Sequence, residues 1–212
     1  MASSRLVAPE LATIKVHGLT REAFLMRSTL AAGAAYGALS ATGLISSALA
    51  ETSGGDVDIL NYALTLEFLE TEFYTQAAKR VKGLAKDESD LTKELRDNEA
   101  AHVDALTATI KDLGGKPVAK PTFAFGGAFG SRMAYLKTAN VLEDTGVSAY
   151  NGAAPMIKST DVLAAAGGIV QIEARHAALI RLVRNRPPAP RAFDAASDMD
   201  EILKAVKPFI KA

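Results

Sequence analysis

Two glutamate–histidine pairs with the same spacing most constrain the fold of this 212-residue chain. Glu99 precedes His102 by three residues, and Glu173 precedes His176 by three residues. This spacing places both side chains of a pair on one face of an α-helix. A single glutamate–histidine pair of this kind is more often a surface glutamate beside a hydrogen-bonded histidine. Two pairs with the same spacing instead predict two helices whose glutamate and histidine side chains face a shared core.

The hydrophobic pattern predicts a chain built from helices. Apolar residues recur with the helical period, and no stretch alternates with period two for long enough to form a strand. Long helices are expected over residues 56–84, 87–113 and 131–151, and from residue 159 or 160 to the break at Pro187–Pro188. A short helix is expected over residues 197–207.

Residues 116–130 form the longest connection between these helices. They contain two prolines, three glycines and three phenylalanines, so the turn-rich segment must bury its aromatic side chains somewhere. One long crossover between two short hairpin connections is a known four-helix-bundle topology. We therefore predict an all-α four-helix bundle over residues 51–185, with a Pro-rich linker and a short C-terminal helix over residues 186–212.

The first 50 residues have the pattern of an export signal peptide. Basic residues come first, residues 28–46 carry no charge, and residues 47–50 form a small-x-small motif suited to signal peptidase. Cleavage is expected after Ala50, which predicts a periplasmic or extracellular protein. The competing interpretation is an uncleaved membrane anchor, which the Ala- and Gly-rich composition of the stretch disfavours.

A short motif inside this segment leaves the export route open. Residues 20–26 resemble the twin-arginine export consensus at Phe24 and Leu25, but Glu22 stands where the second arginine belongs. Both a Sec-like route and a variant twin-arginine route are consistent with this pattern.

Composition excludes several classes of function. The 24 basic residues equal the 24 acidic residues, so no basic field exists to attract nucleic acid. The chain has no cysteine, which excludes disulfides, thiolate zinc sites and a thiol nucleophile. Any metal must be held by oxygen and imidazole ligands.

The other two long helices each contribute a glutamate and a tyrosine. Tyr74 follows Glu67 by seven residues, and Tyr150 follows Glu143 by seven residues. Each pair lies along one helix face, two turns apart. The repeat indicates that the two halves of the bundle are related by an approximate twofold axis, as a two-metal site requires.

Four segments, LNYALTLEFLETEFY, RDNEAAHVDAL, LEDTGVSAYNGAAP and IVQIEARHAAL, resemble the ferritin-like di-metal carboxylate superfamily. The most similar group is the bacterial and plant one called ferritin-like domain or desiccation-related proteins. The resemblance covers nearly all of the chain after residue 50. It implies one inward glutamate from each of two helices and a Glu-x-x-His pair from each of the others. The metal ligands it implies here are Glu67, Glu99, His102, Glu143, Glu173 and His176.

Charge balance favours the same interpretation. Four carboxylates in a bundle core repel one another and lose hydration, so without a cation most of them would be protonated. Two divalent ions supply four positive charges. Oxygen ligands with two imidazoles suit iron first and manganese second, better than magnesium, whereas zinc and copper are not excluded by geometry.

Three further residues are expected around the ligands. Glu70 shares the helix face of Glu67, while the third helix has Gly146 at the equivalent position. Glu70 could be a seventh ligand, a proton shuttle, or an ion-pair partner at the end of the bundle. Tyr74 and Tyr150 are expected to donate hydrogen bonds to ligand carboxylates or relay electrons, the alternative being core packing.

Two hypotheses for function follow from the resemblance. In the first, the protein is a di-metal oxidoreductase that reacts with oxygen or peroxide, as a ferroxidase or by removing peroxide. In the second, it is a stress- or desiccation-associated protein whose metals only stabilise the bundle. A bundle without metal that binds a partner protein is a third interpretation. A homo-oligomer is compatible with all three.

Overall fold

The computed structural model describes residues 15–16, 19–20 and 55–211. The chain divides into two compact units, Met1–Ser53 and Gly54–Ala212. In the first unit, β1 (Lys15–Val16) pairs antiparallel with β2 (Leu19–Thr20). The uncharged stretch and the expected cleavage site after Ala50 lie outside the described residues, so the signal peptide stays a prediction. Within the described residues, no helix has the length and apolar character needed to span a membrane.

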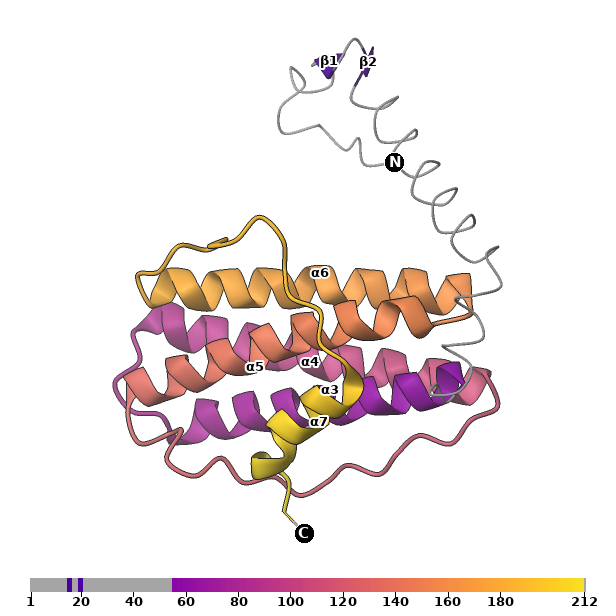
Figure 1. Ribbon diagram of the computed structural model, residues 1–212. Helices are drawn as coiled ribbons and strands as arrows, with labels where there is room; N and C mark the ends of the chain where they lie inside the picture. The colour runs from indigo at the N-terminus through magenta and orange to yellow at the C-terminus, as the bar shows by residue number, and fades with distance from the viewer. Residues whose placement is uncertain (1–14, 17–18, 21–54, 212) are drawn as a thin grey trace, which may run out of the picture. The chain divides into compact units, whose positions relative to one another are not determined.

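Four long helices form the second unit. They are α3 (Asp56–Arg80), α4 (Lys86–Asp112), α5 (Arg132–Ala153) and α6 (Thr160–Val183). The helix α3 packs chiefly on α4, and α5 packs chiefly on α6; α3 also contacts α5, and α4 contacts α6. Figure 1 shows the four helices side by side, with the α4–α5 connection running the length of the bundle. The predicted all-α four-helix bundle with a long crossover is confirmed.

Local sequence explains where these helices begin and end. The helix α3 stops at Arg80, before the predicted end at residue 84, because Val81 is extended and Gly83 adopts a φ of +75°. The side chains of Ser131 and Ser159 accept hydrogen bonds from the first turns of α5 and α6. These caps fix the register of the helices that carry the site.

The crossover is held in place by aromatic packing. Phe123, Phe125 and Phe129 are all buried, as the sequence predicted. The ring centroids of Phe125 and Phe129 each lie 5.2 Å from that of Phe73 on α3. The N–H of Ala124 also donates a 2.8 Å hydrogen bond to the carbonyl of Phe209. The crossover is therefore joined to the C-terminal segment as well as to the bundle.

The C-terminal segment returns to α5. After α6, the chain forms α7 (Met199–Val206) and the 3₁₀-helix η3 (Lys207–Phe209), and a second 3₁₀-helix, η2 (Ala154–Met156), follows α5. The N–H of Ser197 donates a 3.1 Å hydrogen bond to the carbonyl of Ser148. A Cβ at Gly152 would lie 1.8 Å from the carbonyl oxygen of Ser197, so this approach requires glycine.

Candidate metal centre

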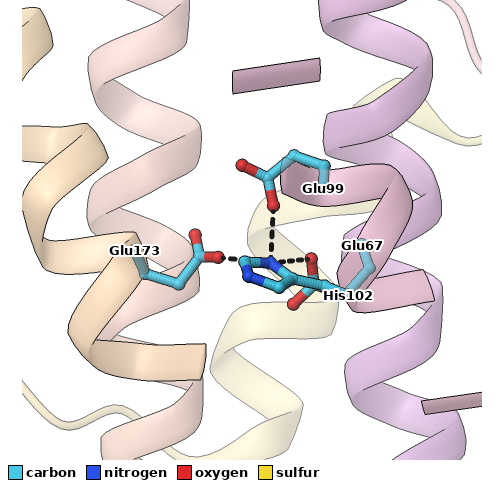
Figure 2. Close-up of side chains that lie close together, drawn as sticks. All are labelled: Glu67, Glu99, His102 and Glu173. Atoms are coloured by element: carbon cyan, nitrogen blue, oxygen red, sulfur yellow. Dashed lines mark hydrogen bonds and ion pairs between the residues drawn. The ribbon is translucent and has the colours of Figure 1, made fainter. Parts of the chain in front are cut away.

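All six residues predicted as metal ligands lie in the interior of the bundle. Each long helix contributes at least one of them, as Figure 2 shows for α3, α4 and α6. None of the four glutamates has exposed surface, and the histidines are at most 9 % exposed. Burial of so many ionisable groups needs a compensating partner. The six are Glu67, Glu99, His102, Glu143, Glu173 and His176.

These side chains form two overlapping groups, within each of which the ligand atoms lie within 4.8 Å of one another. The first group adds Glu67 and His102 to the pair Glu99 and Glu173. The second group adds Glu143 and His176 to the same pair. Two carboxylates are thus shared, and each group has one further carboxylate and one imidazole of its own.

In the first group, Nδ1 of His102 is the point on which the carboxylates converge. It lies 3.2 Å from Oε2 of Glu67, 3.0 Å from Oε2 of Glu99 and 3.2 Å from Oε1 of Glu173. Figure 2 shows these carboxylates approaching the imidazole from three different helices.

In the second group, two carboxylates lie close to the imidazole of His176. Its Nδ1 lies 2.8 Å from Oε1 of Glu99 and 3.4 Å from Oε2 of Glu143. The two imidazole rings are 6.3 Å apart between centroids and inclined by 28°. Each Nδ1 atom therefore faces Glu99 and the glutamate of its own group, and Nδ1 of His102 also faces Glu173.

Five buried atoms in this cluster make no hydrogen bond of good geometry among the described residues; four of them lie 2.8–3.4 Å from an ion-pair partner within the cluster, and only Oε2 of Glu173 has neither kind of contact. The five are Oε1 of Glu99, Oε2 of Glu143, both carboxylate oxygens of Glu173 and Nδ1 of His176. An unsatisfied buried polar atom costs about 1–3 kcal/mol, and more when it is charged. Oxygen and imidazole nitrogen atoms are suitable donors for divalent metals. The residues present therefore fit a pair of cations.

Burial and mutual repulsion control the protonation of the carboxylates. Burial raises the pKa of Glu67 to about 7 and also raises the pKa of Glu143. Burial and the neighbouring Glu99 raise the pKa of Glu173 well above its ordinary value. Burial alone would raise the pKa of Glu99 as well, but His102 and His176 lower it to about 2. Glu99 is therefore the carboxylate that the two imidazoles keep ionised.

Burial affects the pKa of a histidine in the opposite direction to that of a glutamate. Burial by itself would lower the pKa of each, but the adjacent carboxylates raise the pKa of His102 to about 12 and that of His176 to about 10. Without a metal, protons on these imidazoles balance part of the negative charge. A metal must displace those protons, because a coordinating imidazole nitrogen is unprotonated.

The two tyrosines bond to carboxylates of the opposite half. Tyr150 on α5 donates a 2.5 Å hydrogen bond to Oε1 of Glu67 on α3, and Tyr74 on α3 donates to Oε1 of Glu143 on α5. Both hydroxyls are buried, which raises the pKa of each phenol well above its ordinary value. They are therefore hydrogen-bond donors at neutral pH. Electron relay by these residues remains a prediction.

Asn98 is a polar neighbour of the site that the sequence analysis missed. Its Nδ2 lies 3.1 Å from Nε2 of His176, across from α4 to α6. A partner on this second nitrogen fixes the orientation of the ring and leaves Nδ1 to face the carboxylates. The available signal was its position directly before Glu99. The matching residue before Glu173 is Ile172, which has no polar group to offer His102.

Glu70 faces the interior of the bundle and not its end. It is 3 % exposed, and burial together with Glu173 raises its pKa well above the ordinary value. Within residues 55–211, no lysine or arginine forms an ion pair with Glu70, so the structure does not support the alternative of an ion pair at the bundle end.

Comparison with known proteins identifies the family and agrees with the helical-bundle fold. Residues 55–186 match the family model described as a ferritin-like domain. A dodecameric thioferritin from Bacteroides fragilis, a bacterioferritin-related protein, has a similar structure with a TM-score of 0.56 at 22 % identity. The match covers 61 % of this chain and 84 % of that one.

A second structure has the same fold. It is a conserved hypothetical protein from Mycobacterium tuberculosis, with a TM-score of 0.55 at 16 % identity, covering 65 % of this chain and 96 % of the other. At these identities the likeness concerns the fold alone. No curated protein matches the chain.

Proposed function

The chain belongs to the ferritin-like domain family, and from that premise we propose that it binds two divalent metal ions within its bundle and uses them in an oxidative reaction. One observation carries the proposal. Two buried groups of carboxylates and imidazoles overlap in two shared glutamates, and five of their polar atoms make no hydrogen bond of good geometry among the described residues, Oε2 of Glu173 having no ion-pair contact either. Two cations would satisfy these atoms and balance four carboxylates.

The grouping assigns a role to each ligand. Glu67 and His102 would hold one ion, and Glu143 and His176 would hold the other. Glu99 and Glu173 lie in both groups, so each would take part in holding both ions. Iron is the first candidate and manganese the second, because the donor set combines carboxylate oxygen with imidazole.

When bound, a pair of iron or manganese ions would supply redox chemistry, which would serve either oxidation of ferrous ion by oxygen or peroxide, or removal of peroxide. The protein supplies orientation. Tyr74 and Tyr150 each donate a hydrogen bond to one oxygen of a glutamate that belongs to a single group, Glu143 or Glu67. Asn98 orients the ring of His176. The buried setting also keeps bulk water from competing for the ligand oxygens.

Rapid mixing tests this function. Protein loaded anaerobically with ferrous ion is mixed with oxygen in one series and with hydrogen peroxide in another. We expect oxidation faster than that of free ferrous ion in at least one series, and loss of the acceleration in Glu143→Ala. Glu72→Gln is the matched control, because Glu72 lies on α3 outside the site and pairs with Lys120 at 2.6 Å.

The second candidate, a purely structural role for the metals, is favoured by the same unsatisfied atoms. Ions that only complete those contacts would stabilise the bundle by mass action. This role predicts a large rise in melting temperature on metal binding and no acceleration of either reaction. Absence of stoichiometric metal would contradict both candidates.

Export is a separate proposal, supported by the charge pattern of residues 1–50. N-terminal sequencing of protein recovered from outside the cytoplasm tests it. Cleavage after Ala50 predicts Glu51 as the first residue, whereas an intact N-terminus would favour the uncleaved anchor.

A further inference from the structure

The approximate twofold symmetry of the site is broken at one pair of positions. Glu67 on α3 corresponds to Glu143 on α5, and both hold equivalent places in the two groups. Three residues later, α3 has Glu70 whereas α5 has Gly146. One half of the site thus carries a carboxylate where the other half carries no side chain.

The structure shows why these two residues differ. A Cβ at Gly146 would lie 3.3 Å and 3.6 Å from the two carboxylate oxygens of Glu70. The same Cβ would lie 3.0 Å from Oε2 of Glu173, one of the two shared carboxylates. The space left by glycine therefore holds the carboxyl group of Glu70 next to an oxygen that has no hydrogen-bond partner.

Glu70 adds a fifth carboxyl group to this interior. It is almost fully buried, and its carboxyl group lies against Gly146 of α5, at the place where Oε2 of Glu173 also approaches that glycine. Glu70 of α3 thus reaches toward a shared carboxylate and the α5 half of the site. A buried carboxylate without a cation is costly, and the described lysines and arginines do not supply one.

We propose that Glu70 is a seventh metal-binding side chain, an additional oxygen donor that Gly146 admits on one side of the metal pair. The inference rests on the proposed binding of two ions. Its consequence is that the two metal positions are unequal, because only one of them gains this donor. The two ions should therefore bind in two resolved steps.

Titration with Mn²⁺ tests the proposal without reference to activity. The proteins compared are the wild type, Glu70→Gln and the control Glu72→Gln, which makes the same chemical change on the same helix at a half-buried position outside the site. Loss of a residue that supports a metal ligand typically lowers metal affinity by about 10–100-fold, and loss of a ligand itself should cost at least as much. We expect Glu70→Gln to weaken one of the two steps by about tenfold or more and to leave the other close to the wild-type value.

Two further variants test the role of the glycine. Gly146→Ala puts a methyl group at the distances given above, so it should weaken the same step as Glu70→Gln. Exchange of the two residues in Glu70→Gly/Gly146→Glu moves the carboxylate to the opposite helix and should restore two unequal steps. Circular dichroism of the metal-free proteins reports whether each variant retains the helical fold.

The outcomes separate this inference from the proposed function. Two unchanged steps in Glu70→Gln would overturn the role of Glu70 while leaving the two-metal site intact. Equal weakening of both steps would also overturn it, because Glu70 would then act through the shared carboxylates. A wild-type protein that does not bind two ions would instead overturn the proposed function itself.

Discussion

The hydroxyl of Tyr150 donates a 2.5 Å hydrogen bond to Oε1 of Glu67, from α5 across to α3. The other carboxylate oxygen of Glu67, Oε2, faces His102 at 3.2 Å. The half of the bundle related by pseudo-symmetry repeats the arrangement with Tyr74 and Glu143. Each tyrosine thus holds one oxygen of a carboxylate and leaves the second directed at the proposed ion.

We predict that Tyr150→Phe keeps the fold but lowers the affinity for one of the two metal ions by about tenfold. Removal of a residue that orients a ligand typically costs about 10–100-fold in metal affinity. Tyr135→Phe is the matched control, because this buried hydroxyl lies 2.8 Å from Oγ1 of Thr92 and forms no hydrogen bond to any of the six proposed ligands. Metal titration of both variants checks the prediction. Equal affinities in the two variants would show that the hydrogen bond to Glu67 has no such role.

Removal of ligands should have graded effects on the number of ions. Glu99 belongs to both groups and Glu143 to one, so Glu99→Ala should lose both ions whereas Glu143→Ala should lose one. Both proteins should stay helical, because the hydrophobic contacts between the helices remain in each variant. Elemental analysis counts the ions. Retention of two ions by Glu143→Ala would refute its assignment as a ligand.

Metal binding and stability should depend on pH in a defined direction. Folding raises the pKa of Glu67 from 4.5 to about 7 and that of His176 from 6.5 to about 10. Groups with raised pKa values stabilise the metal-free fold below their unfolded values, and this contribution is lost as the pH rises through the folded values. Metal affinity instead rises with pH, because the ligands must lose their protons.

Both effects enlarge, as the pH rises, the difference in stability between the metal-bound and the metal-free protein. The increase in melting temperature produced by Mn²⁺ should therefore be larger at about pH 8 than at about pH 5.5. Glu99, whose pKa is lowered to about 2, opposes this trend only below its unfolded value of 4.5. Thermal unfolding with and without metal at the two pH values checks the sign. A metal-induced increase in melting temperature that becomes smaller with increasing pH would contradict the assignment of these residues as metal ligands.

Two glycine substitutions should have opposite effects on stability. At Gly152 a methyl group would collide with the carbonyl of Ser197, so Gly152→Ala should destabilise the protein by about 1–3 kcal/mol as the C-terminal segment shifts. At Gly167 in α6, none of the described atoms lies within 4 Å of the added Cβ, so Gly167→Ala should stabilise the helix by about 1 kcal/mol. Denaturant unfolding measures both changes. Stability equal to the wild type in Gly152→Ala would show that the segment does not pack closely on α5.

Much of the fold could be predicted because helical periodicity and breakers are local signals. The crossover, its buried phenylalanines and the four long helices all follow from such signals. The end of α3 was predicted too late, because the apolar pattern continues to Leu84 although Gly83 turns the chain. Local pattern alone does not show where a backbone leaves the helix.

The site was predictable in its residue types and not in its pairings. The spacing between Glu99 and His102 is a property of one helix, so the sequence displays it. The bonds from Tyr150 to Glu67 and from Asn98 to His176 join different helices. They depend on the rotation and offset of packed helices, which periodicity does not determine. The same reason explains why the space beside Gly146 became visible only in the folded chain.

The most direct test of the account is the anomalous scattering of crystals of the protein grown with Mn²⁺. Two strong peaks are expected inside the bundle, one beside Glu67 and His102 and the other beside Glu143 and His176. Glu99 and Glu173 should contact both ions. A bundle interior without anomalous peaks, or ions bound only at the surface, would contradict the central claim.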